Sequence, residues 1–112
     1  MKENIKDKIF RGICQNDLCI MNFGYPLPAK AFCEPLNISY YRARKYCKEL
    51  QEEGLIEFIR DYIPDQFSYE GELECEGFFI AGWRITKKAE ETQIYKDEYA
   101  REEKIRKECF GD

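Results

Sequence analysis

The sequence predicts a small α+β domain in which three helices precede a two-stranded β-hairpin and a long helix follows it. Apolar residues recur at helical spacing in the first half of the chain, and charged pairs at helical spacing fill its end. Between them lie two runs rich in β-branched and aromatic residues. Apolar residues make up 44% of the 112 positions, which is enough for one core, and the chain is too short for two domains.

Residues 3–15 predict the first helix. Its apolar positions form one stripe with basic residues outside it: Ile5, Ile9, Phe10, Ile13 and Cys14. Turn-forming residues, Asn16 and Asp17 and then Phe23 to Pro28, end this pattern. A short second helix is expected over about residues 28–34, because proline fits the first helical position. It would bury either Ala31 or Phe32.

The third helix is predicted over residues 39–53. Ser39 offers its hydroxyl to the free N–H groups of the first turn, and Gly54 is a good left-handed cap. The tight turn before the helix contains Asn37, a residue that tolerates the left-handed conformation. At about 100° per residue, the inward face consists of Ala43, Tyr46, Cys47 and Leu50.

The hairpin and the last helix follow Gly54. Residues 55–60 predict one strand, residues 61–77 a turn-rich acidic segment, and residues 78–86 a second strand with one face made of Phe79, Ala81, Trp83 and Ile85. Thr86 is expected to cap a helix over about residues 87–109. Three pairs spaced i,i+4 support that helix: Asp97–Arg101, Glu102–Arg106 and Glu103–Lys107.

Two helices separated by a tight turn and followed by a hairpin form a winged helix-turn-helix arrangement. Residues 36–56 read LNISYYRARKYCKELQEEGLI and resemble winged-helix regulators of the MarR and GntR kind, which typically show L-G-V-S…R-A-L-x-x-L-x-x-x-G-L-I. Residues 82–86 resemble the Y-x-L-T end of their second wing strand. The likeness is strongest to the small winged-helix proteins of phages and mobile elements. It implies a winged domain over residues 1–86, extended by a C-terminal helix over 87–112.

Composition excludes several classes of function. The chain has no histidine, which rules out Ser-His-Asp and Cys-His catalysis and zinc sites with histidine ligands. Its six cysteines contain no Cys-x-x-Cys pair, and we expect reduced, structural thiols. No phosphate-binding loop and no nucleophile–base pair is present. We therefore expect no enzyme, no catalytic residue, no metal and no cofactor. Without a long apolar run or an apolar leader, we expect a cytoplasmic protein outside the membrane.

The charge distribution favours double-stranded DNA as the partner. The net charge is −4, but residues 1–60 contain ten basic and eight acidic side chains. The third helix concentrates the basic ones on its outward and flanking faces, where they can contact phosphates or guanine edges. The predicted DNA-binding residues are Ser39, Tyr40, Tyr41, Arg42, Arg44, Lys45 and Lys48. The expected function is sequence-specific DNA binding by a small transcriptional regulator.

A protein-binding winged helix is the alternative. Residues 61–86 contain six acidic side chains and one basic one. The acidic wing, residues 61–77, would then imitate nucleic acid in a phage-type inhibitor, with Tyr62, Phe67 and Tyr69 exposed beside its carboxylates: Asp61, Asp65, Glu70, Glu72, Glu74 and Glu76.

We also expect a homodimer joined partly through the last helix, which has aromatic and apolar residues near helical spacing: Thr92, Tyr95, Tyr99, Ile105 and Cys109. The alternative is a last helix folded back across its own domain.

Overall fold

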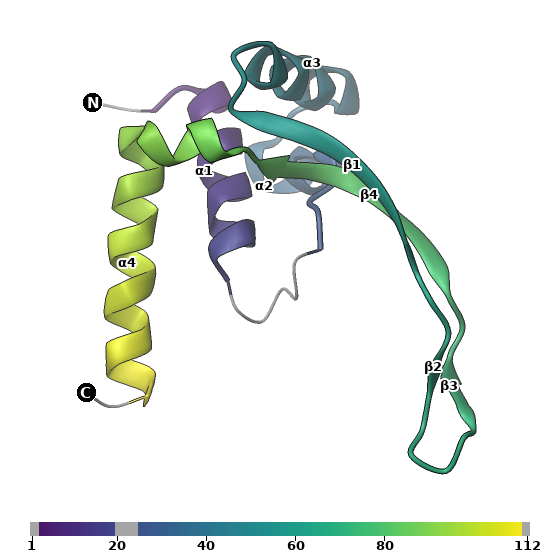
Figure 1. The fold of residues 1–112 in the computed structure, drawn as a ribbon. Coiled ribbons are helices and arrows are strands. Elements are labelled where there is room, and N and C mark those ends of the chain that lie inside the picture. Colours follow the sequence, from purple (N-terminus) through teal and green to yellow (C-terminus); the bar gives the residue numbers. More distant parts are fainter. Residues whose placement is uncertain (1–2, 20–24, 111–112) are drawn as a thin grey trace.

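The computed structural model describes residues 3–19 and 25–110 (Figure 1). Within these residues the chain has an α+β fold of four α-helices and a two-stranded antiparallel sheet, as predicted. A shorter strand pair extends the hairpin. Phe23 and Gly24 of the predicted turn lie outside the described residues. The helices are α1 (Ile5–Leu18), η2 (Ala29–Phe32, 3-10), α2 (Cys33–Leu36), α3 (Tyr40–Glu52), η3 (Lys87–Glu91, 3-10) and α4 (Gln93–Phe110), and the strands are β1 (Ile56–Ile63), β2 (Gln66–Phe67), β3 (Leu73–Cys75) and β4 (Phe78–Ile85).

One apolar core joins α1, η2, α3 and the near end of the sheet. The predicted stripe of α1 is buried from Ile9 to Cys14, and Ile5 packs against it partly exposed. The predicted inward face of α3 is confirmed at Ala43, Cys47 and Leu50, which are buried, while Tyr46 is half-buried. Of the two alternatives in the second helix, Phe32 is buried and Ala31 is exposed. The core therefore fixes which side of α3 faces outward.

The turn between α2 and α3 depends on Asn37. This residue has φ 52° and ψ 52°, the left-handed conformation anticipated from its side chain. The N–H of Ile38 then donates a 3.0 Å hydrogen bond to the carbonyl of Cys33. Because the chain reverses within this turn, Ser39 is placed at the start of α3.

The first strand of the sheet is longer than predicted, and the second matches its predicted range to within one residue. β1 pairs with β4 over eight residues each, from Ile56 opposite Ile85 to Ile63 opposite Phe78. On its other side, β4 exchanges two backbone hydrogen bonds of 2.8 and 3.0 Å between Trp83 and Leu27. A Cβ on Gly82 would lie 2.7 Å from the backbone of Leu27, so the glycine permits this close approach.

Residues 56–85, called the arm below, project away from the helices (Figure 1). β2 and β3 form the far part of the arm, with Gln66 opposite Cys75 and Phe67 opposite Leu73. At the tip, the N–H of Ser68 donates a 2.7 Å hydrogen bond to the carbonyl of Glu72. No helix lies over the far part of the arm in Figure 1, so the apolar side chains there stay exposed.

The prediction that Thr86 caps one continuous last helix is wrong. The Thr86 hydroxyl donates to the carbonyl of Gly54 at 2.5 Å instead. A 3-10 segment follows it, and Thr92 caps α4 by accepting a 3.2 Å hydrogen bond from the N–H of Tyr95. The backbone bends at Thr92 because that residue is extended, with ψ 153°.

After this bend α4 lies beside α1 (Figure 1). The ion pairs within α4 join Glu98 to Arg101 and Glu103 to Arg106, so they are spaced i,i+3. In the described residues, none of the three pairs predicted at i,i+4 forms a salt bridge. None of the helices in the described residues is long and apolar enough to cross a bilayer.

Candidate nucleic-acid interface

The outward surface of α3 is set by its cap and its buried face. The Oγ of Ser39 accepts a 3.1 Å hydrogen bond from the N–H of Arg42, which starts the helix. Since Ala43, Cys47 and Leu50 face the core, Arg44, Lys45 and Lys48 point outward and are exposed. Ser39 is thus occupied as a cap, and the exposed residues of α3 must provide any contact surface.

A groove of about 550 Å³ lies between α3 and the base of the arm. From α3 it is lined by Tyr40, Arg44, Lys48 and Gln51, and the arm contributes Phe58 and Trp83 among others. The rings of Phe58 and Trp83 meet edge to face with centroids 5.2 Å apart. The groove therefore combines two cationic side chains with an aromatic wall.

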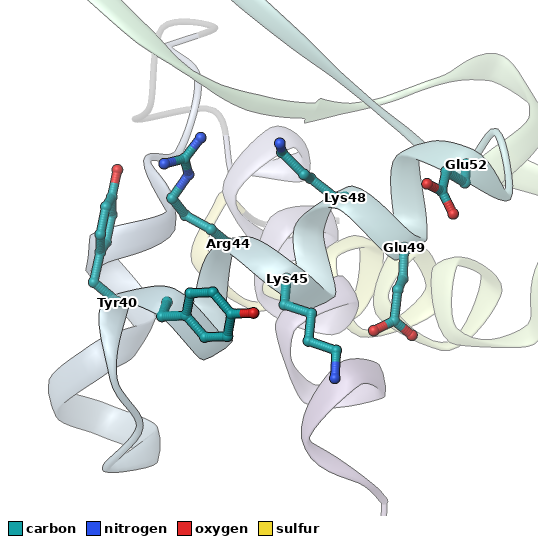
Figure 2. A pocket seen from close by; sticks show the side chains of 7 residues that line it. Tyr40, Arg44, Lys45, Lys48, Glu49 and Glu52 are labelled. Carbon is teal, nitrogen blue, oxygen red and sulfur yellow. The ribbon is translucent and has the colours of Figure 1, made fainter.

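A second, shallower hollow of about 480 Å³ covers the outer side of the same helix. It shares Tyr40, Arg44 and Lys48 with the groove and adds Tyr41, Lys45, Glu49 and Glu52. In Figure 2, Arg44 and Lys48 project to one side of the helix, and Lys45 projects to the other together with Glu49. Tyr41 is 78% exposed, so nothing in the described chain covers its ring.

The three cations Arg44, Lys45 and Lys48 form no salt bridge with any described residue. Arg44 lies over the ring of Tyr40, 5.7 Å from its centroid, and its guanidinium donates no hydrogen bond to a described residue. By contrast, Lys6 pairs with Glu49 and Glu53 at the edge of the helix that faces α1. The outward face of α3 thus has three cations without a salt-bridge partner among the described residues, next to the carboxylates of Glu49 and Glu52.

Arg42 lies apart from the other predicted binding residues. Its guanidinium donates a 3.2 Å hydrogen bond to the Tyr46 hydroxyl and lies 5.8 Å from that ring's centroid. Arg42 and Arg44 are about 160° apart around the helix, so one flat or grooved ligand surface reaches only one of them. The structure therefore brings Tyr40, Arg44 and Lys48 together and places Tyr41 and Lys45 next to them. Arg42 lies on another side of the helix, away from this group.

The sequence did not identify Phe58, Ala81 and Trp83 as neighbours of this surface. Phe58 pairs with Trp83 and Arg60 with Ala81 across β1 and β4, and the alternation of a strand puts all four on one face. The alternation was visible in the sequence. The sequence does not show the register of β1 on β4, because that register pairs residues more than 20 positions apart.

The acidic side chains of the wing lie on the arm and are exposed. None of the six forms a salt bridge with a described residue. Two of them support the backbone locally: Asp65 accepts a 2.6 Å hydrogen bond from the N–H of Gly77, and Asp61 accepts one of 2.8 Å from the N–H of Tyr62. Tyr62, Phe67 and Tyr69 are exposed, as predicted.

The described residues contain no cluster of three or more His, Cys, Asp or Glu side chains that could hold a metal ion. All six cysteines lie within the described ranges, and the structure records each as a free thiol. Cys14 and Cys47 are buried in the core, as the helix stripes predicted. Burial raises the pKa of Cys14 to about 12 and that of Cys47 to about 11.

Comparison of the chain with protein-family models, with curated proteins and with solved structures found no significant match.

Proposed function

We propose that this protein binds double-stranded DNA as a winged helix-turn-helix domain, with α3 as the helix that enters the major groove. The observation that carries the proposal is a set of three exposed cations on the outward side of α3, Arg44, Lys45 and Lys48, which form no salt bridge with a described residue. α2, the Asn37 turn, α3 and the following hairpin have the order that this arrangement needs. With 13 residues α3 is about 20 Å long, and the major groove admits a helix.

The two kinds of side chain on α3 suit different parts of a duplex. Arginine donates two parallel hydrogen bonds to a guanine edge, so Arg44 is the residue we assign to base recognition. The lysine ammonium is a point charge that suits phosphates, so we assign Lys45 and Lys48 to phosphate contacts. Tyr40 and Tyr41 add hydroxyl donors and rings that can pack on a thymine methyl group. This division makes the protein a sequence-specific binder, and the small size fits a transcriptional regulator.

The arm sets the orientation of the duplex. Its carboxylates repel phosphates, so the far part of the arm stays away from the DNA backbone and recognition falls to α3. The net charge of −4 predicts weak binding to DNA of unrelated sequence.

The test is a selection of bound duplexes from a random pool, followed by titration of the enriched duplex with single variants. Arg44→Ala should cost about 1–3 kcal/mol of binding free energy and relax preference at one base pair. Lys45→Ala should weaken binding to all sequences alike and lower the salt slope by about one unit. Lys104→Ala removes an exposed lysine of α4 and is the matched control, which should bind like the parent.

All three variants should keep the parent's thermal midpoint, because their side chains are exposed. If no duplex is enriched, or if Arg44→Ala and Lys45→Ala bind like Lys104→Ala, the DNA proposal is wrong.

A protein-binding winged helix is the second candidate function. The observation that favours it is the arm, whose six exposed carboxylates lack salt bridges with the described residues and lie beside uncovered rings. Such a surface resembles the charge and the stacked bases of nucleic acid. This candidate predicts that Glu72→Gln with Glu74→Gln weakens binding to a basic partner protein and leaves duplex binding unchanged.

A further inference from the structure

One face of the β1–β4 ribbon is covered at its base and bare beyond it. At the base, Ile56 and Trp83 are buried in the core. Further along the same face, Phe58 is 50% exposed, Tyr62 is 48% exposed and Phe79 is 74% exposed. The register and the alternation of the two strands put these side chains on one side of the ribbon. The part of this side that contains Phe58, Tyr62 and Phe79 is called the ring face below.

Contacts between side chains hold the exposed rings in place. Phe58 meets the buried Trp83 edge to face, with centroids 5.2 Å apart. Two backbone hydrogen bonds with Leu27 fix Trp83 in turn. Tyr62 and Phe79 are opposite each other in the register, and their ring centroids are 4.9 Å apart. Exposed rings on an ordered support are the feature on which proteins stack the bases of single-stranded nucleic acids.

The one charged side chain on the ring face is a cation. Arg60 lies on β1 between Phe58 and Tyr62, is exposed, and forms no salt bridge with a described residue. The two carboxylates of β1, Glu57 and Asp61, lie on the opposite face, and β4 contains no Asp or Glu. A row of phosphates along the ring face therefore meets an arginine and no carboxylate of these two strands.

The groove between α3 and the base of the arm continues the ring face. Phe58 lines this groove together with Arg44 and Lys48, and none of its lining residues is Asp or Glu. Arg44 and Lys48 also line the outer hollow of α3. A DNA strand in contact with these two cations can therefore pass from the outward side of α3 through the groove and onto the ring face.

We propose that the ring face binds a short stretch of single-stranded DNA, with bases stacked on Phe58, Tyr62 and Phe79 and a phosphate on Arg60. The path of this strand rests on the proposed function, which puts a duplex on α3, and the strand continues from that duplex. Phe58 and Tyr62 are four residues apart on one strand, about 13 Å, which is room for a few nucleotides. Beyond the ring face the arm is acidic and repels phosphates, so the bound stretch ends there.

Charge and shape together favour DNA as the occupant. An apolar protein surface on the ring face would bury Arg60 without a counter-ion, which costs free energy. Single-stranded DNA supplies a phosphate for the arginine and a flat base for each ring. The preferred ligand is therefore a duplex with a single-stranded extension.

The test compares three labelled ligands by fluorescence anisotropy at low salt. They are a blunt duplex, the same duplex with a single-stranded extension of about eight nucleotides, and the extension alone. Extensions of both polarities are measured. With one of them, the extended duplex should bind at least about tenfold more tightly than the blunt one.

Two double variants separate base stacking from apolar contact. Tyr62→Leu with Phe79→Leu keeps apolar side chains and removes the rings, so it should abolish the gain from the extension and leave blunt-duplex affinity unchanged. Tyr62→Phe with Phe79→Tyr keeps both rings and should keep the gain. Tyr99→Leu removes a ring that is 49% exposed on α4, and this control should bind all three ligands like the parent.

Arg60→Gln tests the ring face without removing a packed side chain. It should reduce the gain severalfold and lower the salt slope of the extended duplex by about one unit. Lys104→Gln, which removes an exposed lysine of α4, is the matched control and should leave the gain and the slope unchanged.

The three ligands also separate this inference from the duplex proposal. An extended duplex that binds no more tightly than the blunt one overturns the ring face and leaves the duplex proposal standing, as does a gain that both Arg60→Gln and the double leucine variant retain. If the blunt duplex does not bind, the duplex proposal is wrong. Binding of the extension alone that the double leucine variant loses would still support the ring face.

Discussion

The guanidinium of Arg11 donates a 2.8 Å hydrogen bond to the carboxylate of Glu98, which joins α1 to α4 across 87 positions of sequence. Glu98 also accepts hydrogen bonds of 3.2 Å from Gln15 and from Arg101. It is the one charged residue buried among the described residues, so its interactions fix the position of the last helix.

Glu98→Gln should lower the free energy of unfolding at pH 7 by about 1–3 kcal/mol, because hydrogen bonds to a charged acceptor become hydrogen bonds to a neutral one. Urea denaturation measures the change. Glu108→Gln, at an exposed position of the same helix, is the control and should leave stability unchanged.

The stability difference between the parent and Glu98→Gln should depend on pH. Burial acts to raise the pKa of Glu98, but the hydrogen bonds from Arg11, Gln15 and Arg101 outweigh it and lower the pKa below its ordinary 4.5. A carboxyl whose pKa is lowered by folding stabilises the protein above its unfolded pKa and loses that contribution as the pH falls through the folded value. The stability difference between the parent and Glu98→Gln should therefore shrink below pH 4.5. A difference that stays constant down to about pH 3 contradicts this account.

Removing the charge of Asp17 should have the opposite effect on stability from removing the charge of Glu98. Its carboxylate accepts a 2.7 Å hydrogen bond from the N–H of Ile85, and burial raises its pKa more than this bond lowers it. Asp17→Asn keeps an acceptor and removes the buried charge, so it should be at least as stable as the parent at pH 7. Asp17→Ala leaves the N–H unpaired and should cost about 1–3 kcal/mol. Thermal and urea unfolding of the two variants compare them directly, and equal losses would show that the hydrogen bond is unimportant.

Asn37 should tolerate glycine and reject alanine. At φ 52° an alanine costs about 1–2 kcal/mol, whereas glycine adopts this conformation without strain. Both substitutions leave the exposed face of α3 untouched. Asn37→Ala should therefore lower the thermal midpoint and leave duplex affinity unchanged at temperatures where the variant is folded. An alanine variant as stable as the glycine variant would mean that the turn relaxes.

The cysteines should react in two classes. Cys14 and Cys47 are buried with raised pKa values of about 12 and about 11, while Cys19, Cys75 and Cys109 are exposed. Because the thiolate is the reactive form, iodoacetamide at about pH 8 should label the exposed class and spare the buried pair. Mass spectrometry of peptides after native labelling locates the adducts. In urea all five should be labelled, and native labelling of Cys47 at the rate of Cys75 would contradict the core assignment.

Features that depend on neighbouring residues were predictable from the sequence. The Ser39 cap, the buried face at Ala43, Cys47 and Leu50, and the left-handed Asn37 all follow from side chains within a few positions. Helical spacing and capping are local effects, and the structure agrees with them.

Features that depend on residues far away in the sequence could not be predicted. Thr86 has the chemistry of a helix cap, but Gly54, 32 positions earlier, accepts its hydroxyl, and Thr92 takes the capping role. The groove required the register of β1 on β4 and the placement of α3 beside both. β1 extends past Arg60 through Ile63, because these added residues find apolar partners in β4: Tyr62 lies opposite Phe79, and Ile63 lies opposite Phe78.

The root of the arm is anchored to the end of α3 at three points. The N–H of Thr86 donates to the carbonyl of Leu55 at 3.0 Å, its hydroxyl donates to Gly54, and the ammonium of Lys88 donates to the carbonyl of Glu53 at 2.9 Å. The base of the arm is therefore fixed to the C-terminal end of α3, and the direction in which the arm projects depends on this junction. Any displacement of the base of the arm would have to break or strain these hydrogen bonds to the end of α3.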